Sequence, residues 1–455
     1  MEKKPATYTG SFRETSADLC RDDTDGLAGA RKALLGSGYL TIFAQAISGG
    51  TFFTALLIAM GADEAYIGYV TMATTLCMAA QFPAPLFWER QKTRKGLILW
   101  LGVVGDFLTY LGLPIAAILP VSHQWKLGLY MAMTLLSGLI NQFCLPARNA
   151  WMMQSIPFSK RVSYTSLTSM VHSVINVISV FLAGLMLDGF EAAELSLGSI
   201  SPTLWALFLL RILAFATSSA SNLWMALRIR EFAYDSEEKT AVRLSVLLEP
   251  IRNKPFFRMI LLPCLWALLN GMIGNYFNLH LIENVKMSYT VISSAIFINT
   301  PMILLITPIW TKILRQNDWI KSLAWGILGF SLAWCCNVLI SPQAPVFYFI
   351  AIIVGFLFSP GINMVNTNLI YVHMPKENRT AYFAFYSLMT TVFTFIGQAF
   401  GTWFITATTA VRFTLFGIEI VNLQLISAVA AFFAVIFAAT LLIAKARCTP
   451  GEDQL

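Results

Sequence analysis

Long apolar runs alternate with short polar segments along almost the whole chain. A membrane-spanning helix needs roughly 20 mostly apolar residues, and twelve runs meet this length. They are continuous and rich in Leu, Ile, Ala and Phe, whereas a membrane β-barrel would show short alternating segments, so they predict an all-α polytopic membrane protein. The predicted spans are 34–60, 66–88, 96–119, 125–148, 163–187, 202–227, 257–281, 289–311, 320–341, 345–372, 380–406 and 420–444.

The connections differ in charge between the two sides of the predicted membrane. When the termini and every second loop are assigned to one side, that side carries 27 of the 31 Lys and Arg residues. The other loops hold only Lys126, Lys286 and Arg412, and Arg211 lies within a span. Because basic loops stay in the cytoplasm, we expect a multi-pass protein of the cell membrane (plasma or inner) with both termini cytoplasmic.

A long connection divides the predicted spans into two sets of six. Its first part, 228–239, is highly charged, and apolar residues then recur at helical spacing between 244 and 251. This pattern favours a helix on the membrane surface or, equally, a solvated spacer. The predicted organisation is a cytoplasmic tail (1–33, without a signal-peptide pattern), a six-helix bundle (34–227), a cytoplasmic linker (228–256), a second six-helix bundle (257–444) and a cytoplasmic tail (445–455).

Local patterns recur in the two halves at a nearly constant offset. The segments 157–164 and 375–382 both follow P-x-x-x-R-x-[S/A]-Y, 218 residues apart, which gives Arg161 and Arg379 equivalent places. Residues 49–52 match 274–277 at an offset of 225. Parallel repeats of this kind predict two related bundles with a cleft between them.

The loop after the second span carries a further resemblance. Residues 85–95 are Pro-Leu-Phe-Trp-Glu-Arg-Gln-Lys-Thr-Arg-Lys. With twelve spans, cytoplasmic termini and a charged central loop, the chain resembles the major facilitator superfamily over about residues 34–445, with no subfamily assigned. The loop is similar to the family's G-x-x-x-D-R-x-G-R-K, with Glu89 in the Asp place, Arg90 in the basic place, and Pro85 and Lys92 in place of the glycines.

This resemblance implies which residues change contacts during a transport cycle. In the family, the loop locks the two bundles together on the cytoplasmic side. The implied gating residues are Glu89, Arg90, Arg94, Arg161 and Arg379. The alternative is that the basic loop only anchors the chain by the positive-inside rule.

The family fold also indicates where a substrate would bind. Its first, fourth, seventh and tenth helices line a central cavity, helped by the second, fifth, eighth and eleventh. Polar residues of several of these predicted spans lie on one helical face, and they suit a neutral or weakly polar organic solute; the alternative is that they join helices to one another. The candidate substrate-binding residues are Gln45, Asn141, His172, Asn176, Trp266, Asn270, Asn363, Asn366 and Tyr386.

Two charged residues lie deep inside predicted spans. Asp106 is about ten residues from the cytoplasmic start of the third span, and Arg211 about nine from the external start of the sixth. At 1.5 Å per residue both lie roughly 13–16 Å deep. Since an unpaired charge at that depth is costly, we expect Asp106 and Arg211 to form a buried pair, which either ties the helices or takes part in proton coupling.

Composition restricts the function further. With 57% hydrophobic and 12% charged residues, the chain is neither an ordinary soluble enzyme nor a disordered protein. The net charge of +7 follows from the basic cytoplasmic loops and is no nucleic-acid signal. The sequence contains no G-x-x-x-x-G-K-[S/T] loop, no CxxC pair and no His/Cys cluster, and its four histidines are scattered, so we expect no enzyme, no metal and no cofactor.

The function expected from the sequence is transport. The chain would be a secondary active transporter that moves a small organic solute by alternating access, as a symporter or antiporter, with H⁺ and Na⁺ as candidate coupling ions. Its partners would be the solute and the lipid bilayer, with no nucleic acid, and it would be a monomer. The alternatives are a multidrug or lipid-like compound exporter of the same fold and a sensor that no longer transports.

Overall fold

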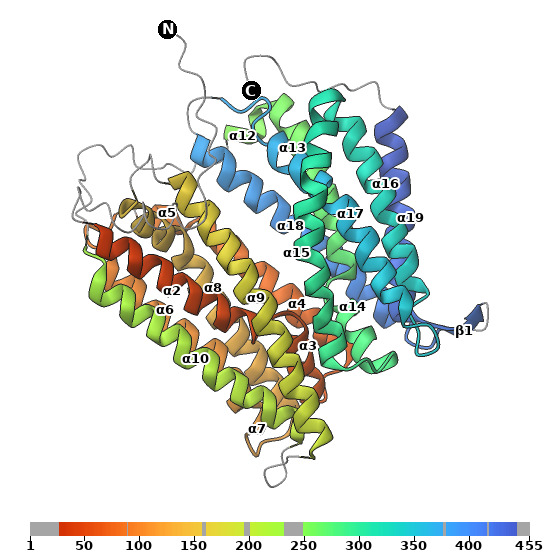
Figure 1. Ribbon diagram of the computed structural model, residues 1–455, viewed down its shortest axis with the longest axis horizontal. Coiled ribbons are helices and arrows are strands. Elements are labelled where there is room, and N and C mark those ends of the chain that lie inside the picture. Colours follow the sequence, from red (N-terminus) through yellow and green to blue (C-terminus); the bar gives the residue numbers. More distant parts are fainter. Residues whose placement is uncertain are drawn as a thin grey trace.

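The computed structural model describes residues 27–88, 90–156, 161–194, 201–231, 249–375, 379–415 and 418–443, and these are mostly helical. Figure 1 shows a first group of helices, α2 to α10, beside a second group, α13 to α19. The start of α2 at Ala28 and the end of α19 at Ile443 lie at the same end of the molecule, which we name the termini face. The opposite end carries a β-hairpin and is named the hairpin face.

The first group contains three long uninterrupted helices and several broken ones. Its elements are α2 (Ala28–Ala46), α3 (Gly50–Ala59), α4 (Glu64–Met78), η1 (Ala79–Gln81), α5 (Ala84–Trp88), α6 (Lys95–Asp106), the π-helix η2 (Phe107–Gly112), α7 (Leu113–Ile118), α8 (His123–Gln154), α9 (Arg161–Ala192) and α10 (Pro202–Arg228).

The second group also contains both long helices and short or irregular elements. Its elements are α12 (Glu249–Arg252), α13 (Lys254–Ile273), α14 (Tyr276–Leu279), the π-helix η4 (His280–Asn284), α15 (Tyr289–Gln316), α16 (Trp319–Val338), α17 (Val346–Leu369), α18 (Arg379–Ala407), the antiparallel strands β1 (Arg412–Leu415) and β2 (Ile418–Val421), and α19 (Asn422–Ile443). The hairpin was not predicted, because its strands are only four residues long.

Ten helices of the described residues are long and apolar enough to cross a membrane, or eleven if α2 and α3 count as one span bent by 40°. The bend falls at Gly49 and Gly50, and Gly50 has a positive φ that glycine adopts without strain. The predicted second span is interrupted after Met78. Pro83 and Pro85 follow within seven residues, and proline cannot donate the backbone hydrogen bond that a regular helix needs.

Several predicted boundaries shift. Helix α8 continues to Gln154, so Arg148, which the sequence analysis counted in a loop, lies inside a helix. In the linker, the apolar positions 244–248 lie outside the described residues, and the short α12 follows them. Most of the amino-terminal tail (1–26), residues 232–248 of the linker and the whole of the carboxy-terminal tail (445–455) also lie outside the described residues.

Glycines allow helices of the second group to touch through their backbones. A Cβ at Gly397 would collide with the carbonyl of Leu268, and one at Gly401 with the carbonyl of Met272. Gly271 on α13 meets the Thr394 carbonyl on α18 in the same way. Small residues at helix interfaces permit this close approach, which drives helix association where no hydrophobic effect acts between helices.

This contact predicts opposite effects of two glycine-to-alanine changes. Gly397→Ala should lower the melting temperature, because overpacking costs about 1–3 kcal/mol. Gly128→Ala on α8, where a new Cβ meets nothing within 4 Å, should leave it unchanged or slightly higher, since alanine is the better helix former. Thermal unfolding in detergent followed by size-exclusion chromatography measures both, and equal effects would contradict the packing described here.

Candidate functional site

A cavity of about 490 Å³ lies between α9 and α15, one helix from each group. Its lining is mostly apolar, with a few polar side chains. The lining residues are Ser169, Met170, Val171, Ser173, Val174, Asn176, Val177, Ile296, Asn299, Ile303 and Leu304. The cavity therefore joins the two groups of helices rather than lying inside either of them.

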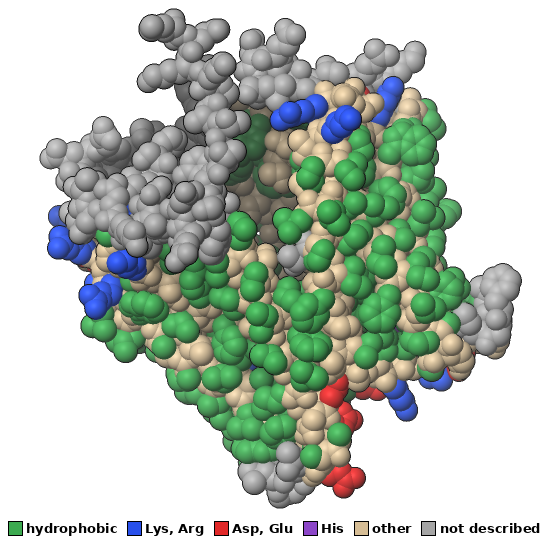
Figure 2. All heavy atoms as spheres, viewed as in Figure 1, with side chains coloured by type: hydrophobic (Ala, Val, Ile, Leu, Met, Phe, Trp, Pro, Cys, Tyr) green, Lys and Arg blue, Asp and Glu red, His purple; other side chains and the backbone are tan. Residues whose placement is uncertain are grey.

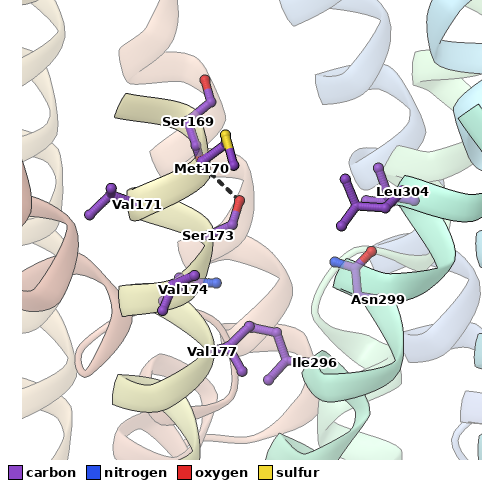
Figure 3. A pocket seen from close by; sticks show the side chains of 11 residues that line it. Ser169, Met170, Val171, Ser173, Val174, Val177, Ile296, Asn299 and Leu304 are labelled. Atoms are coloured by element: carbon purple, nitrogen blue, oxygen red, sulfur yellow. Dashed lines mark hydrogen bonds between the residues drawn. The ribbon is translucent and has the colours of Figure 1, made fainter. Parts of the chain in front are cut away.

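The cavity is a wedge that opens toward the termini face. Figure 3 shows Val177 and Ile296 close together, whereas Met170 and Leu304, farther toward the termini face, stand apart. The Asn299 side chain points across the gap toward α9. Its Oδ1 atom is buried and has no hydrogen-bond partner among the described residues. An amide oxygen left in this state is costly, whereas Figure 3 shows the amide nitrogen of Asn299 directed toward α9.

The same two groups of helices are in contact at the hairpin face. A Cβ at Gly68 of α4 would collide with the hydroxyls of Tyr276 and Thr402 in the second group. The Asn275 amide donates a hydrogen bond to the Thr71 hydroxyl over 3.0 Å. The two groups are therefore separated near the termini face and packed together near the hairpin face, which agrees with the hollow in Figure 2.

Among the predicted substrate-binding residues, Asn176 lines the wedge cavity. His172 lies one turn away on α9, but its ring packs against α2, with a ring-centre distance of 6.1 Å to Tyr39. The Asn366 side chain is buried, and its Oδ1 atom has no partner among the described residues. Asn176, His172 and Asn366 thus place polar side chains between the helices.

The other predicted substrate-binding residues do not line the wedge cavity, and several use their polar groups locally. Trp266 stacks on Trp334 of α16, within the second group. Asn141 packs against Gly105 of the third predicted span, and Asn270 bonds to a carbonyl of its own helix. Gln45 and Asn363 are exposed, and Tyr386 packs near the start of α13. Substrate binding by these residues stays a prediction.

The described residues among the predicted gates lie at the termini face. Glu89 lies outside the described residues, as do the side chains of Arg161 and Arg379 at the starts of α9 and α18. Arg90 is exposed. The Arg94 backbone N–H donates to the carboxylate of Glu231 over 2.9 Å, so the loop after the second span is fastened to the end of α10, in the same group of helices.

The expected ion pair between Asp106 and Arg211 does not form. Oδ2 of Asp106 accepts hydrogen bonds from the Ser218 hydroxyl (2.6 Å) and the Asn222 amide (2.8 Å), both on α10. Arg211 donates instead to the Thr109 carbonyl over 3.3 Å. Because Ser218 is seven residues from Arg211 on α10, it lies about 10 Å farther along the helix axis. The carboxylate and the guanidinium are thus at different depths.

The partner missed by the sequence analysis is Arg148. Its guanidinium donates a hydrogen bond to the Asn222 side-chain oxygen over 2.9 Å, so Asn222 bridges Arg148 and Asp106. We name Asp106, Arg148, Ser218 and Asn222 the polar network of the first group. Asn141, Leu145 and Arg148 lie on one face of α8, which was the available signal, but the predicted span ended at residue 148 and the charge count placed this arginine in the following loop.

Comparison with known proteins decides the family. The family model of the Major Facilitator Superfamily matches residues 38–398. The chain belongs to the major facilitator superfamily. It is therefore a transporter and not an enzyme, in agreement with the expectation from the sequence. No curated protein matches it by sequence.

Solved structures of other superfamily transporters share the fold. The nucleoside transporter NupG aligns with a TM-score of 0.68 at 13% identity, over 91% of this chain and 98% of that protein. A bacterial homologue of the human lysosomal transporter Spinster, inward-facing and unoccupied, gives 0.66 at 14% identity, over 94% and 100%. A D-xylose–proton symporter gives 0.62 at 10% identity, over 91% and 96%. At these identities the likeness shows the fold alone.

The polar network predicts that Asn222 stabilises the transporter. Asn222→Ala should lower the free energy of unfolding by about 1–3 kcal/mol, because Asp106 and Arg148 both lose a buried partner. Asn368→Ala is the matched control: Asn368 is exposed and bonds only to Met364 of its own helix, so its change should stay within about 0.5 kcal/mol. Reversible unfolding in mixed micelles measures both, and equal losses would contradict the network.

Proposed function

We propose that this superfamily member is a secondary active transporter that moves a small, neutral or weakly polar organic solute across the cell membrane by alternating access. The proposal includes twelve spans in two bundles of six. The ten long helices would be completed by the bent pair α2–α3 and by the interrupted run α4–η1–α5. A bend and a break of this kind are tolerated in a membrane when protein surrounds the irregular backbone.

The observation that carries the proposal is the wedge cavity. It is open toward the termini face, while the two groups of helices touch at the hairpin face. Alternating access needs a binding region between two bundles that is closed on one side at a time. The wedge cavity supplies such a region between α9 and α15.

The chemistry of the lining supports the class of solute. All eleven lining residues are uncharged, and the polar ones carry hydroxyl or amide groups. Asn176 and Asn299 can exchange hydrogen bonds with hydroxyl or carbonyl groups of a solute, and the aliphatic side chains can cover its apolar faces. A charged solute would lack a counter-charge among these lining residues.

Charge placement supports an orientation with cytoplasmic termini. In the view of Figure 2, Lys and Arg side chains gather toward the termini face and most of the acidic ones toward the hairpin face. By the positive-inside rule the termini face is cytoplasmic, and the wedge cavity then opens inward. We retain Arg90 and Arg94 as candidates for contacts that close this side, and we retain the monomer as the functional unit.

An exporter of multidrug or lipid-like compounds is the second candidate. Met170, Val174 and Leu304 line the wedge cavity and are 54%, 54% and 69% exposed. Such side chains can accept an apolar compound that enters sideways from the bilayer. Export of lipophilic dyes, without uptake of polar metabolites, would favour this second function.

The proposed function predicts a specific loss of affinity. A panel of chemically diverse metabolites should be screened in vesicles with and without a proton gradient. For the solute identified, Asn299→Ala and Asn176→Ala should each raise KM about fivefold to tenfold, the effect of one lost hydrogen bond. Asn317→Ala, at the exposed end of the same helix α15, should leave KM unchanged. Unchanged KM values in both cavity variants would contradict the binding site.

A second prediction concerns Asp106. We propose H⁺, with Na⁺ as the alternative, as the coupling ion, and we assign Asp106 a structural role because its Oδ2 atom is held by Ser218 and Asn222. Asp106→Asn should reduce thermal stability while transport keeps its response to a proton gradient. Selective loss of that response in a stable Asp106→Asn protein would instead assign the coupled proton to Asp106.

A further inference from the structure

Asp188 of α9 joins the two groups of helices at the hairpin face. Its Oδ1 atom accepts a hydrogen bond from the backbone N–H of Tyr289 over 2.9 Å. Its Oδ2 atom accepts one from the backbone N–H of Thr290 over 2.8 Å. Both donors belong to the first turn of α15. One carboxylate of the first group thus covers the amino-terminal end of a helix of the second group.

The first turn of α15 depends on this carboxylate for its hydrogen bonds. The first N–H groups of any helix have no partner within that helix. In α15, the Ser288 hydroxyl accepts from the N–H of Val291, and Asp188 takes the N–H groups of Tyr289 and Thr290. The amino-terminal end of a helix also carries a partial positive charge, which attracts an anion. The contact is therefore stronger than two neutral hydrogen bonds.

Close backbone packing brings Asp188 into place. Gly184 lies four residues before Asp188 and therefore on the same face of α9. A Cβ at Gly184 would stand 2.9 Å from the Tyr289 carbonyl oxygen and 2.9 Å from the Ser293 hydroxyl. Only a residue without a side chain lets α9 approach α15 so closely. Gly184 and Asp188 together form one contact surface for the first turns of α15.

A second carboxylate makes a related contact at another boundary between the groups. Oε2 of Glu64, at the start of α4, accepts a hydrogen bond from the side-chain amide of Asn422 over 2.7 Å. Asn422 is the first residue of α19. The contact uses a side-chain donor instead of two backbone donors, so it leaves fewer helix groups without partners when it breaks.

We propose that Asp188 is a latch that holds the hairpin face closed while the wedge cavity is open, and that its two hydrogen bonds break each time the transporter opens to the other side. The proposal rests on alternating access as the proposed function. When α9 and α15 separate, water can solvate both the carboxylate and the freed N–H groups. The contact can therefore stabilise one state and still release.

The test measures how often the hairpin face opens. Ser293 is 3% exposed and lies against Gly184, so Ser293→Cys places a thiol within the closed contact. The seven native cysteines are first replaced by alanine or serine. A membrane-impermeant maleimide is then applied, in separate samples, to each side of the membrane, and the labelling rate of the new thiol is followed.

Asp188→Ala should raise the labelling rate from the hairpin side about tenfold. This factor corresponds to a loss of about 1.4 kcal/mol in the stability of the closed state relative to the open state. Asp188→Asn, which keeps an acceptor oxygen but no charge, should give an intermediate rate. Glu191→Ala is the matched control, because it removes an acidic side chain one turn away on α9 that is exposed, and its rate should equal that of the parent. A size-exclusion profile of each variant is recorded first, to test whether that variant is folded.

An unchanged rate in folded Asp188→Ala protein, or an equal increase in Glu191→Ala, would overturn the latch. Labelling needs no substrate, so this result stays separate from the fate of the proposed function. Uptake by the parent protein in the same membranes tests that function on its own: transport without an effect of Asp188 would refute only the latch.

Discussion

Inside a membrane, hydrogen-bonding groups cannot bond to water and must find partners within the protein, and this constraint governs most of the features described here. Backbone groups satisfy it by forming helices. Polar side chains satisfy it by bonding across helices, as Asp106 does with Ser218 and Asn222. The buried oxygen of Asn299 has no partner among the described residues, so the constraint is not met there, and Asn299 is a candidate to bond the proposed solute.

The two groups of helices meet mainly through two pairs, α4 with α18 and α9 with α15. At the hairpin face both pairs include a glycine, Gly68 and Gly184, at which a side chain would collide with the other group. Nearer the termini face, α9 and α15 separate and the wedge cavity begins. One pair of helices therefore contributes both the closed contact and the cavity, so a tilt of one helix against the other changes both together.

Much of the fold could be predicted from the sequence because hydropathy and loop charge are local properties. Ten to eleven of the spans and the superfamily follow from them. The interruption after Met78 was missed although Pro83 and Pro85 were a local signal for it, and the π-helix at Phe107–Gly112 has the same hydropathy as a regular helix. The predicted fourth span ended too early, at Arg148 instead of Gln154, because a half-buried arginine with an Asn222 partner has the same hydropathy as an arginine in a loop.

The site was harder to predict than the fold. Counting residues from the predicted span starts places Asp106 and Arg211 at comparable depths. The depth of Asp106 is counted from the cytoplasmic face, whereas that of Arg211 is counted from the external face. An error of a few residues at each boundary therefore moves the two side chains a full turn apart. Periodicity also shows that Asn141 and Trp266 face protein without showing which helix they face. Asn141 meets Gly105 and Trp266 meets Trp334, and these are contacts that only the three-dimensional packing determines.

Carboxylates at helix starts show how one interaction can serve two mechanical purposes. The carboxylate of Glu231 accepts hydrogen bonds from the N–H groups of Arg94 and Lys95 at the start of α6, just as Asp188 does for Tyr289 and Thr290 at the start of α15. Glu231 follows α10, which packs with α6 in the first group, so a rigid movement of that group leaves the contact intact. Asp188 and α15 belong to different groups, so any relative movement of the groups must stretch it. The difference between a permanent cap and a latch therefore lies in which helices move together, not in the chemistry of the contact.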